Sequence, residues 1–227
     1  VANADQMLVV LAIANPEPRT RLVDRYLAAA FDAGLKPILC ITKVDLADPT
    51  EFLANFAGLS IPVVLNRSDA PSVDELRGLL DGHTTVVVGH SGVGKSTLVN
   101  AIVPGANLAT GHVNSVTGRG RHTSTAVRAI SLDESNRELG WIIDTPGVRS
   151  FGLGHVKIEN LIRSFEDLWK VIETCPRDCS HLADAPDCAL DEAVESGALG
   201  EAGLARVDSL RRLMASASSA STDGNRE

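Results

Sequence analysis

The sequence TTVVVGHSGVGKSTLVN, residues 84–100, predicts a buried strand that runs into a glycine-rich loop and then into a helix. The loop fits the pattern G-x-x-x-x-G-K-[ST], in which glycines let successive backbone N–H groups converge on phosphate oxygens. A glycine turn before an ordinary helix is the alternative, but four fixed positions match by chance in under roughly 1% of chains this long. The stretch therefore predicts nucleotide binding by Gly89, His90, Ser91, Gly92, Val93, Gly94, Lys95, Ser96 and Thr97.

Two side chains of this loop have specific predicted roles. Lys95 would contact the β- and γ-phosphates, and the Ser96 hydroxyl would bind Mg²⁺. Kinases, ATPases and GTPases all use such a loop, so the nucleotide has to be identified from other residues.

Short apolar runs alternate with helical patterns on both sides of the loop. Ser72 and Glu75 stand at capping-box positions at the start of one predicted helix. This alternation is typical of an α/β fold of the P-loop NTPase type with a mostly parallel sheet. We expect strands at residues 7–14, 37–41, 61–65, 84–88, 126–132 and 139–143, and helices at 19–33, 49–57, 72–80 and 95–102.

Other parts of the chain lack this alternation. Residues 104–123 contain four glycines and little apolar periodicity, which predicts a long functional loop. From about residue 158 the chain becomes helical and acidic, and helices are expected at 188–199 and 201–214. Residues 215–227 are rich in Ser and Ala without an apolar pattern, which predicts a disordered tail.

The composition is that of an ordinary globular protein. Of the 227 residues 44% are hydrophobic, and the formal net charge is -8. No apolar run reaches the roughly 18 residues needed to span a bilayer, which excludes a membrane protein. The negative charge disfavours a protein whose whole surface binds nucleic acid. Because the chain begins at Val1, with neither an initiator Met nor a signal peptide, we expect a fragment or processed product.

Thr42-Lys43-Val44-Asp45 follows a predicted strand and offers a way to select the base. The Asp45 carboxylate would accept hydrogen bonds from N1–H and the N2 amine of guanine, whereas adenine presents an acceptor at N1 and lacks that amine. Lys43 would lie along the base plane. For the tetrapeptide alone, a solvated Lys and a helix-capping Asp are the alternative, and the other motifs favour guanine.

Asp144-Thr145-Pro146-Gly147 follows the last predicted strand, where a Mg²⁺-side motif should lie. Asp144 would hold a water molecule on Mg²⁺, and the Gly147 N–H would bond the γ-phosphate. Thr123 or Thr125 is the expected second Mg²⁺ ligand, and the sequence does not decide between them. As a bare tetrapeptide the motif is also a good β-turn.

The cysteines indicate a metal site. Cys175, Cys179, His181 and Cys188 supply three thiolates and one imidazole within a short segment, which is a ligand set of closed structural Zn²⁺ sites. This crowding suits a reducing cytoplasm better than a disulfide framework. Free buried cysteines are the alternative.

The order of the motifs is unusual for a GTPase, because Asp45 precedes the phosphate loop. The chain resembles a circular permutant, and specifically the ribosome small-subunit-dependent GTPase family RsgA, also called YjeQ. The resemblance covers the chain from Val1 to about Met214. It rests on VANADQ, TKVD, GHSGVGKSTLVN, GRGRHTST, IDTPGVRSFGL and the cysteine segment ending in CALDEAVESGAL.

This resemblance implies a GTPase of late 30S maturation, with an N-terminal OB-fold, a permuted G domain and a helical zinc domain. Here the chain is expected to open after the OB-fold, with a GTPase domain at 1–155, a zinc-binding domain at 156–214 and the tail at 215–227. The implied ligands are GTP or GDP, Mg²⁺ and one structural Zn²⁺. The implied partners are the small ribosomal subunit and its rRNA, with a monomer acting in the cytoplasm and no membrane.

Three features of the nucleotide site depart from common GTPases. Thr42 stands where many carry Asn, and residues 63–68 lack a Ser-Ala motif behind the base. Val148 occupies the position where many place the Gln that orients the attacking water. We therefore expect slow intrinsic hydrolysis that the ribosome stimulates, with His122 brought to the water; a solvated loop histidine is the alternative.

Two other functions stay open from the sequence. A P-loop ATPase or kinase would bind ATP and GTP equally. A zinc and RNA binding module would use GTP only as a structural ligand, and no ribosomal component would raise its turnover.

Overall fold

The computed structural model describes residues 3–110, 127–145 and 156–223. The chain divides into two compact units that alternate along the sequence. The first comprises Val1–Arg19, Leu35–Thr50 and Ile61–Phe151, and the second Thr20–Gly34, Glu51–Ser60 and Gly152–Glu227. The second unit thus includes two segments from the first third of the chain.

The first unit is built on a six-stranded sheet in the order β3-β2-β1-β4-β6-β5. Neighbouring strands are parallel except β5 and β6, which are antiparallel. The predicted mostly parallel sheet is confirmed, and every predicted strand is present with slightly different ends. The strands are β1 (Gln6–Ala12), β2 (Lys36–Thr42), β3 (Val63–Asn66), β4 (His83–Val88), β5 (Arg128–Ser131) and β6 (Gly140–Asp144).

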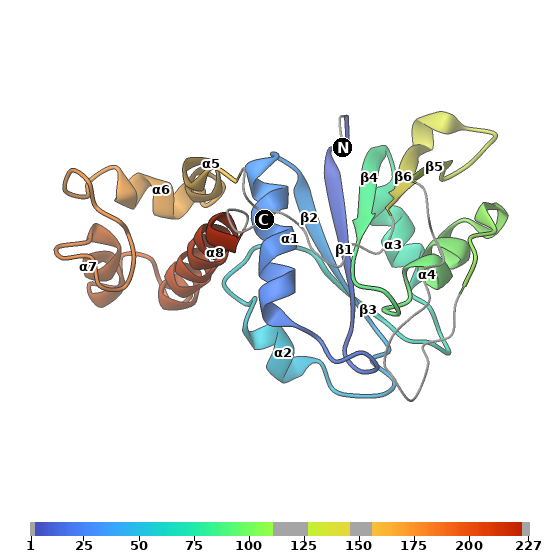
Figure 1. Cartoon of the computed structure of the whole chain (residues 1–227), viewed down its shortest axis with the longest axis horizontal. Coiled ribbons are helices and arrows are strands. Elements are labelled where there is room, and N and C mark those ends of the chain that lie inside the picture. The colour runs from blue at the N-terminus through green and yellow to red at the C-terminus, as the bar shows by residue number, and fades with distance from the viewer. Residues whose placement is uncertain (1–2, 111–126, 146–155, 224–227) are drawn as a thin grey trace. The chain divides into compact units, whose positions relative to one another are not determined.

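Helices α3 (Val73–Leu80) and α4 (Lys95–Ile102) pack on one face of this sheet (Figure 1). Alternate strand residues such as Leu8 and Ile142 are buried in the core that these helices complete. Every residue of β1 is buried, so both faces of this strand are covered. Because both faces are buried, the sequence of a central parallel strand is a continuous apolar run. The short helices η1 (Pro104–Ala106) and η2 (Arg137–Leu139) also belong to this unit.

Long-range arginine contacts hold the second unit together. Arg206 forms two bonds of 2.6 Å with the Asp167 carboxylate and donates to the Gly58 carbonyl oxygen at 2.9 Å. Arg212 Nε lies 3.1 Å from both carboxylate oxygens of the buried Asp24. These bonds explain why segments from the first third of the chain join the C-terminal helices. The helices are α1 (Thr20–Asp32), α2 (Thr50–Ala54), α5 (Ile158–Arg163), α6 (Glu166–Ile172), α7 (Ala189–Glu195) and α8 (Gly203–Asp223).

Three local predictions are wrong. Ser72 does not cap α3 with its side chain, because its hydroxyl donates to the Leu65 carbonyl oxygen at 2.8 Å. The helix expected at 188–199 ends at Glu195. The tail expected to be disordered from residue 215 is helical as far as Asp223, since α8 continues and buries Ala217.

None of the helices in the described ranges combines the length and the apolar character that a membrane crossing requires.

Candidate nucleotide-binding site and metal centre

The carboxyl ends of the parallel strands meet at one edge of the sheet, where ligands bind in folds of this kind. β4 lies between β1 and β6, with β2 beyond β1 and β3 beyond β2. The ends of β2, β3, β4 and β6 lead into or contain residues 43–45, 66–68, 89–94 and 144–145. Those residues predicted for the base, the phosphates and Mg²⁺ that the structure describes therefore share this edge.

Two loop glycines occupy positions where a side chain would be strained, one by a close contact and the other by its backbone conformation. Gly89 has φ 153°, and a Cβ there would lie 2.2 Å from the carbonyl oxygen of Val10 in β1. Gly94 has φ 98° and directly precedes α4, so the chain enters this helix from a left-handed conformation. The phosphate loop predicted from the sequence thus has the backbone that its glycines were expected to allow.

Lys95 is folded back onto its own loop. Its Nζ donates to the carbonyl oxygens of Gly89 at 2.7 Å and His90 at 3.2 Å. Burial lowers the pKa of Lys95 to about 8, and the Asp144 carboxylate opposes this shift by attraction. Asp144 is fully buried at the end of β6. The loop therefore holds a buried amine whose charged form is favoured by a buried carboxylate.

Thr42 and Lys43 connect the predicted base-selecting segment to the phosphate loop. The Thr42 hydroxyl lies 2.6 Å from the carbonyl oxygen of Val93 and 3.1 Å from that of Leu11. Lys43 Nζ donates to the Gly92 carbonyl oxygen at 3.2 Å and also to that of Asn15. Burial lowers the pKa of Lys43, and Asp45 opposes the shift. The hydroxyl that replaces the common Asn side chain thus makes the link to the loop.

Sequence reasoning missed the segment that orients Asp45. The backbone N–H of Ser68 donates to the Asp45 carboxylate at 2.8 Å, and this bond holds the pKa of Asp45 below its ordinary value. The buried Asn66 accepts a bond of 3.0 Å from the Ser72 N–H and so fixes the loop after β3. The proximity of the two segments could have been predicted from strand order, because β2 and β3 are adjacent parallel strands that end at the same edge.

A cavity of about 170 Å³ lies between these segments. It is lined by residues of the base-selecting segment, the loop after β3, the end of the phosphate loop and α4, including Thr42, Lys43, Arg67, Ser68, Gly94 and Thr97. Five residue predictions fall outside the described residues and stay untested, namely His122, Thr123, Thr125, Gly147 and Val148.

The remaining residues of the predicted loop differ in burial and contacts. Ser96 is half-buried in the first turn of α4, and Thr97 is exposed. The His90 ring lies 2.9 Å from the Ser91 carbonyl oxygen through Nδ1. Thr145 donates its hydroxyl to the Val87 carbonyl oxygen at 2.7 Å and so fixes the end of β6 against β4.

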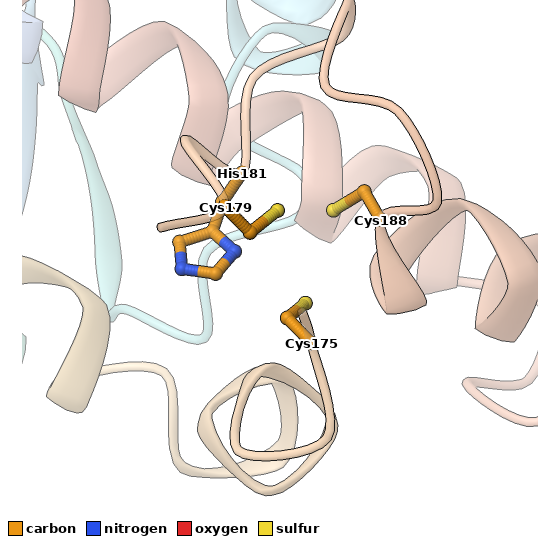
Figure 2. A group of neighbouring side chains, drawn as sticks. All are labelled: Cys175, Cys179, His181 and Cys188. Atoms are coloured by element: carbon orange, nitrogen blue, oxygen red, sulfur yellow. The ribbon is translucent and has the colours of Figure 1, made fainter. Parts of the chain in front are cut away.

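The four predicted metal ligands come together in the second unit. The side chains point toward a common centre (Figure 2), and their ligand atoms all lie within 4.8 Å of one another. Cys175 follows α6 and Cys188 immediately precedes α7, with the other two on the segment between. His181 has a left-handed φ of 57°, which bends this segment. All four cysteines of the chain are free thiols, as the prediction of a metal site requires.

This centre fits Zn²⁺ in its chemistry. Tetrahedral bonds of about 2.0–2.3 Å separate ligand atoms by roughly 3.3–3.8 Å, so small side-chain rotations would close the group on one ion. His181 Nδ1 is buried and lacks a hydrogen-bond partner among the described residues. Burial raises the pKa of Cys175 to about 11, so a thiolate there needs a nearby cation.

The sequence of this chain is similar to those of known proteins. The model of the RsgA GTPase family matches residues 1–154. Proteins named small ribosomal subunit biogenesis GTPase RsgA are similar over 223 residues, for example that of Pseudomonas aeruginosa PAO1, with 40% identity, 95% of this chain and 63% of the relative. The protein of the same name from Ectopseudomonas mendocina is 38% identical, and the match covers 95% of this chain and 62% of the relative. The chain thus spans less than two thirds of these relatives.

Two solved structures share the fold. YjeQ from Thermotoga maritima superposes with a TM-score of 0.64 at 28% identity, covering 95% of this chain and 72% of that one. YloQ, described as a circularly permuted GTPase, gives a TM-score of 0.65 at 29% identity, covering 96% and 69%. The predicted permuted G-domain fold is confirmed, and it explains why Asp45 precedes the phosphate loop.

Proposed function

The chain belongs to the RsgA GTPase family, and from this premise we propose that it binds and hydrolyses GTP during maturation of the small ribosomal subunit. The observation that carries the proposal is the bonding of Thr42 and Lys43 to carbonyl oxygens of Val93 and Gly92. These bonds link the segment that carries Asp45 to the phosphate loop.

Different residues of the site bind the base and the phosphates of the nucleotide. Asp45 accepts the N1–H and N2 amine of guanine, while the Ser68 N–H keeps the carboxylate ionised and oriented. Lys43 flanks the base. On binding, Lys95 exchanges the carbonyl oxygens of Gly89 and His90 for phosphate oxygens. The backbone from Gly89 to Thr97 surrounds the phosphates, and the helix N-terminus adds its positive end.

Mg²⁺ would be held by the Ser96 hydroxyl and, through water, by Asp144. It would neutralise developing charge on the phosphates. We assign the second loop ligand to Thr123 or Thr125 and the γ-phosphate contact to the Gly147 N–H. Val148 cannot orient the attacking water, so intrinsic hydrolysis is slow, and His122 takes that role when the small subunit is bound.

The proposed partners and setting come from the same premise. The partners are the small subunit and its rRNA, and the chain acts as a monomer in the cytoplasm. Cys175, Cys179, His181 and Cys188 hold one structural Zn²⁺, since four protein ligands leave no open position for catalysis. An ATPase or kinase is disfavoured because adenine would leave the Asp45 carboxylate unpaired.

Equilibrium binding of GDP and ADP tests the choice of base. In the presence of Mg²⁺ we expect GDP to bind at least about 100-fold more tightly than ADP, because only guanine satisfies both oxygens of Asp45. Titration calorimetry with the same protein sample measures both. Equal affinities would favour the ATPase or kinase.

The low pKa of Lys95 predicts a pH dependence. Burial lowers this pKa to about 8 in the free protein, whereas bound phosphate favours the charged amine. Because the neutral amine gains population above pH 8, GDP affinity should fall about tenfold between pH 7 and pH 9. Fluorescence titration measures the GDP affinity at each pH. Lys95→Arg is the control, because its guanidinium stays charged and its GDP affinity should not change with pH. A wild-type profile as flat as that of the variant would contradict the role of Lys95.

A further inference from the structure

Helix α8 brings one arginine to the candidate metal centre. Arg211 Nε donates to the carbonyl oxygen of His181 at 3.0 Å, and its Nη2 lies 3.9 Å from the Sγ of Cys188. The remaining bonds, both 2.8 Å, go to the carboxylate of Asp191 in α7. The Arg211 side chain is only 13% exposed. One guanidinium therefore contacts two of the four ligand residues and is fixed by a third residue.

The charges of the centre favour a cation at this place. Three thiolates and one Zn²⁺ carry a formal charge of about −1, because the imidazole is neutral. A guanidinium beside Cys188 offsets that charge and donates a hydrogen bond to the sulfur. The bond to the His181 carbonyl holds the bend from which the imidazole projects. Outer contacts of this kind typically change metal affinity by about 10- to 100-fold.

An ordinary ion pair between α7 and α8 is the alternative explanation for Arg211. Partly exposed ion pairs contribute little, and would not act on the metal. The same helix offers a matched comparison in Arg206, which also makes a two-pronged bond to an aspartate and donates to a backbone carbonyl. Its partners, Asp167 and Gly58, are not ligand residues of the metal centre.

We propose that Arg211 is a positioning residue of the zinc site, which sets how tightly and how long the ion is held. The inference rests on the proposed Zn²⁺ at this centre. It gives α8 a role beyond packing, because the helix that pairs with Asp24 of α1 through Arg212 also fixes two ligands of the metal. Retention of the ion is therefore tied to the docking of α8.

Competition with a chromophoric zinc chelator tests the proposal on the full chain. The wild type, Arg211→Gln, Arg211→Lys and Arg206→Gln are compared for zinc affinity and for the rate of zinc release. We expect Arg211→Gln to bind zinc about 10- to 100-fold more weakly and to release it faster. The zinc affinity of Arg211→Lys should lie between those of the wild type and Arg211→Gln, since an amine keeps the charge but lacks the planar guanidinium group. Arg206→Gln should stay within about twofold of the wild type, although it loses a similar ion pair.

The outcomes distinguish the role of Arg211 from the presence of the zinc site. Thermal unfolding of each zinc-loaded variant shows whether a loss of affinity follows a general loss of stability. If the wild type holds zinc and both Arg211 variants match it, or if Arg206→Gln weakens zinc binding as much as Arg211→Gln, the positioning role is wrong while the zinc site stands. If the wild type takes up no zinc, the zinc site and this inference both fail.

Discussion

Asp45→Asn should lower GDP affinity by roughly two to three orders of magnitude, the largest effect we expect at the nucleotide site. The variant amide cannot accept hydrogen bonds from both N1–H and the N2 amine, and its own NH₂ group faces a donor. The side-chain oxygen still accepts the Ser68 N–H, so the loop geometry should survive. Titration calorimetry of GDP binding measures the loss.

The same variant should gain a different ligand. Xanthine carries a carbonyl in place of the N2 amine, so the variant NH₂ group can donate to it, and xanthosine diphosphate should bind the variant more tightly than GDP. Asp69→Asn is the control, because Asp69 lies in the adjacent loop, is exposed and pairs with Arg67 at 2.8 Å. An Asp45→Asn protein that binds GDP like the control would contradict the assignment of the base site.

Cys188→Ala should abolish zinc binding and destabilise the second unit. The segment from Cys175 to Cys188 contains little buried apolar surface, with Cys188 itself buried at the start of α7. Structural zinc contributes about 10–16 kcal/mol in small zinc peptides, and the helices here have a core of their own. We therefore expect a loss of several kcal/mol, or roughly 10 °C in melting temperature for a chain of this size.

Metal content by native mass spectrometry and thermal unfolding with and without chelator measure this effect. The matched control is Cys40→Ala, which removes a fully buried thiol from β2 and leaves the four ligands intact. The control should keep one zinc ion and respond to chelator like the wild type. A wild-type melting temperature that chelator leaves unchanged would contradict a structural role for the ion.

The central strands of the sheet were predictable because they are buried along most of their length. β1 contains no polar side chain after Gln6, and such a run can hardly be anything other than a central strand. The phosphate loop was predictable because its glycines have backbone conformations that other residues rarely adopt. Gly89, pressed against the Val10 carbonyl, is the clearest case.

Contacts between distant residues set the features that sequence reasoning missed. The division into units depends on Arg206 with Gly58 and on Arg212 with Asp24, pairs that no local pattern reveals. The Ser72 hydroxyl donates to the Leu65 carbonyl oxygen of β3 instead of capping α3. Tertiary packing thus overrides local preference in both places.

Some residues of the candidate site were predictable from the sequence and others were not. Residues on one continuous segment, such as Lys95 and the zinc ligands, follow from spacing. The Ser68 N–H that orients Asp45 does not, since a backbone donor leaves no mark on residue type. Arg211 was missed because it acts from α8 on a segment far away in the sequence.

Phosphate release from GTP and from ATP, measured on this chain with and without purified small ribosomal subunits, tests the central claim most directly. We predict slow release from GTP, a several-fold or larger increase when small subunits are added, and no comparable release from ATP under either condition. GTP release that small subunits leave unchanged, or ATP release equal to it, would contradict the proposed function.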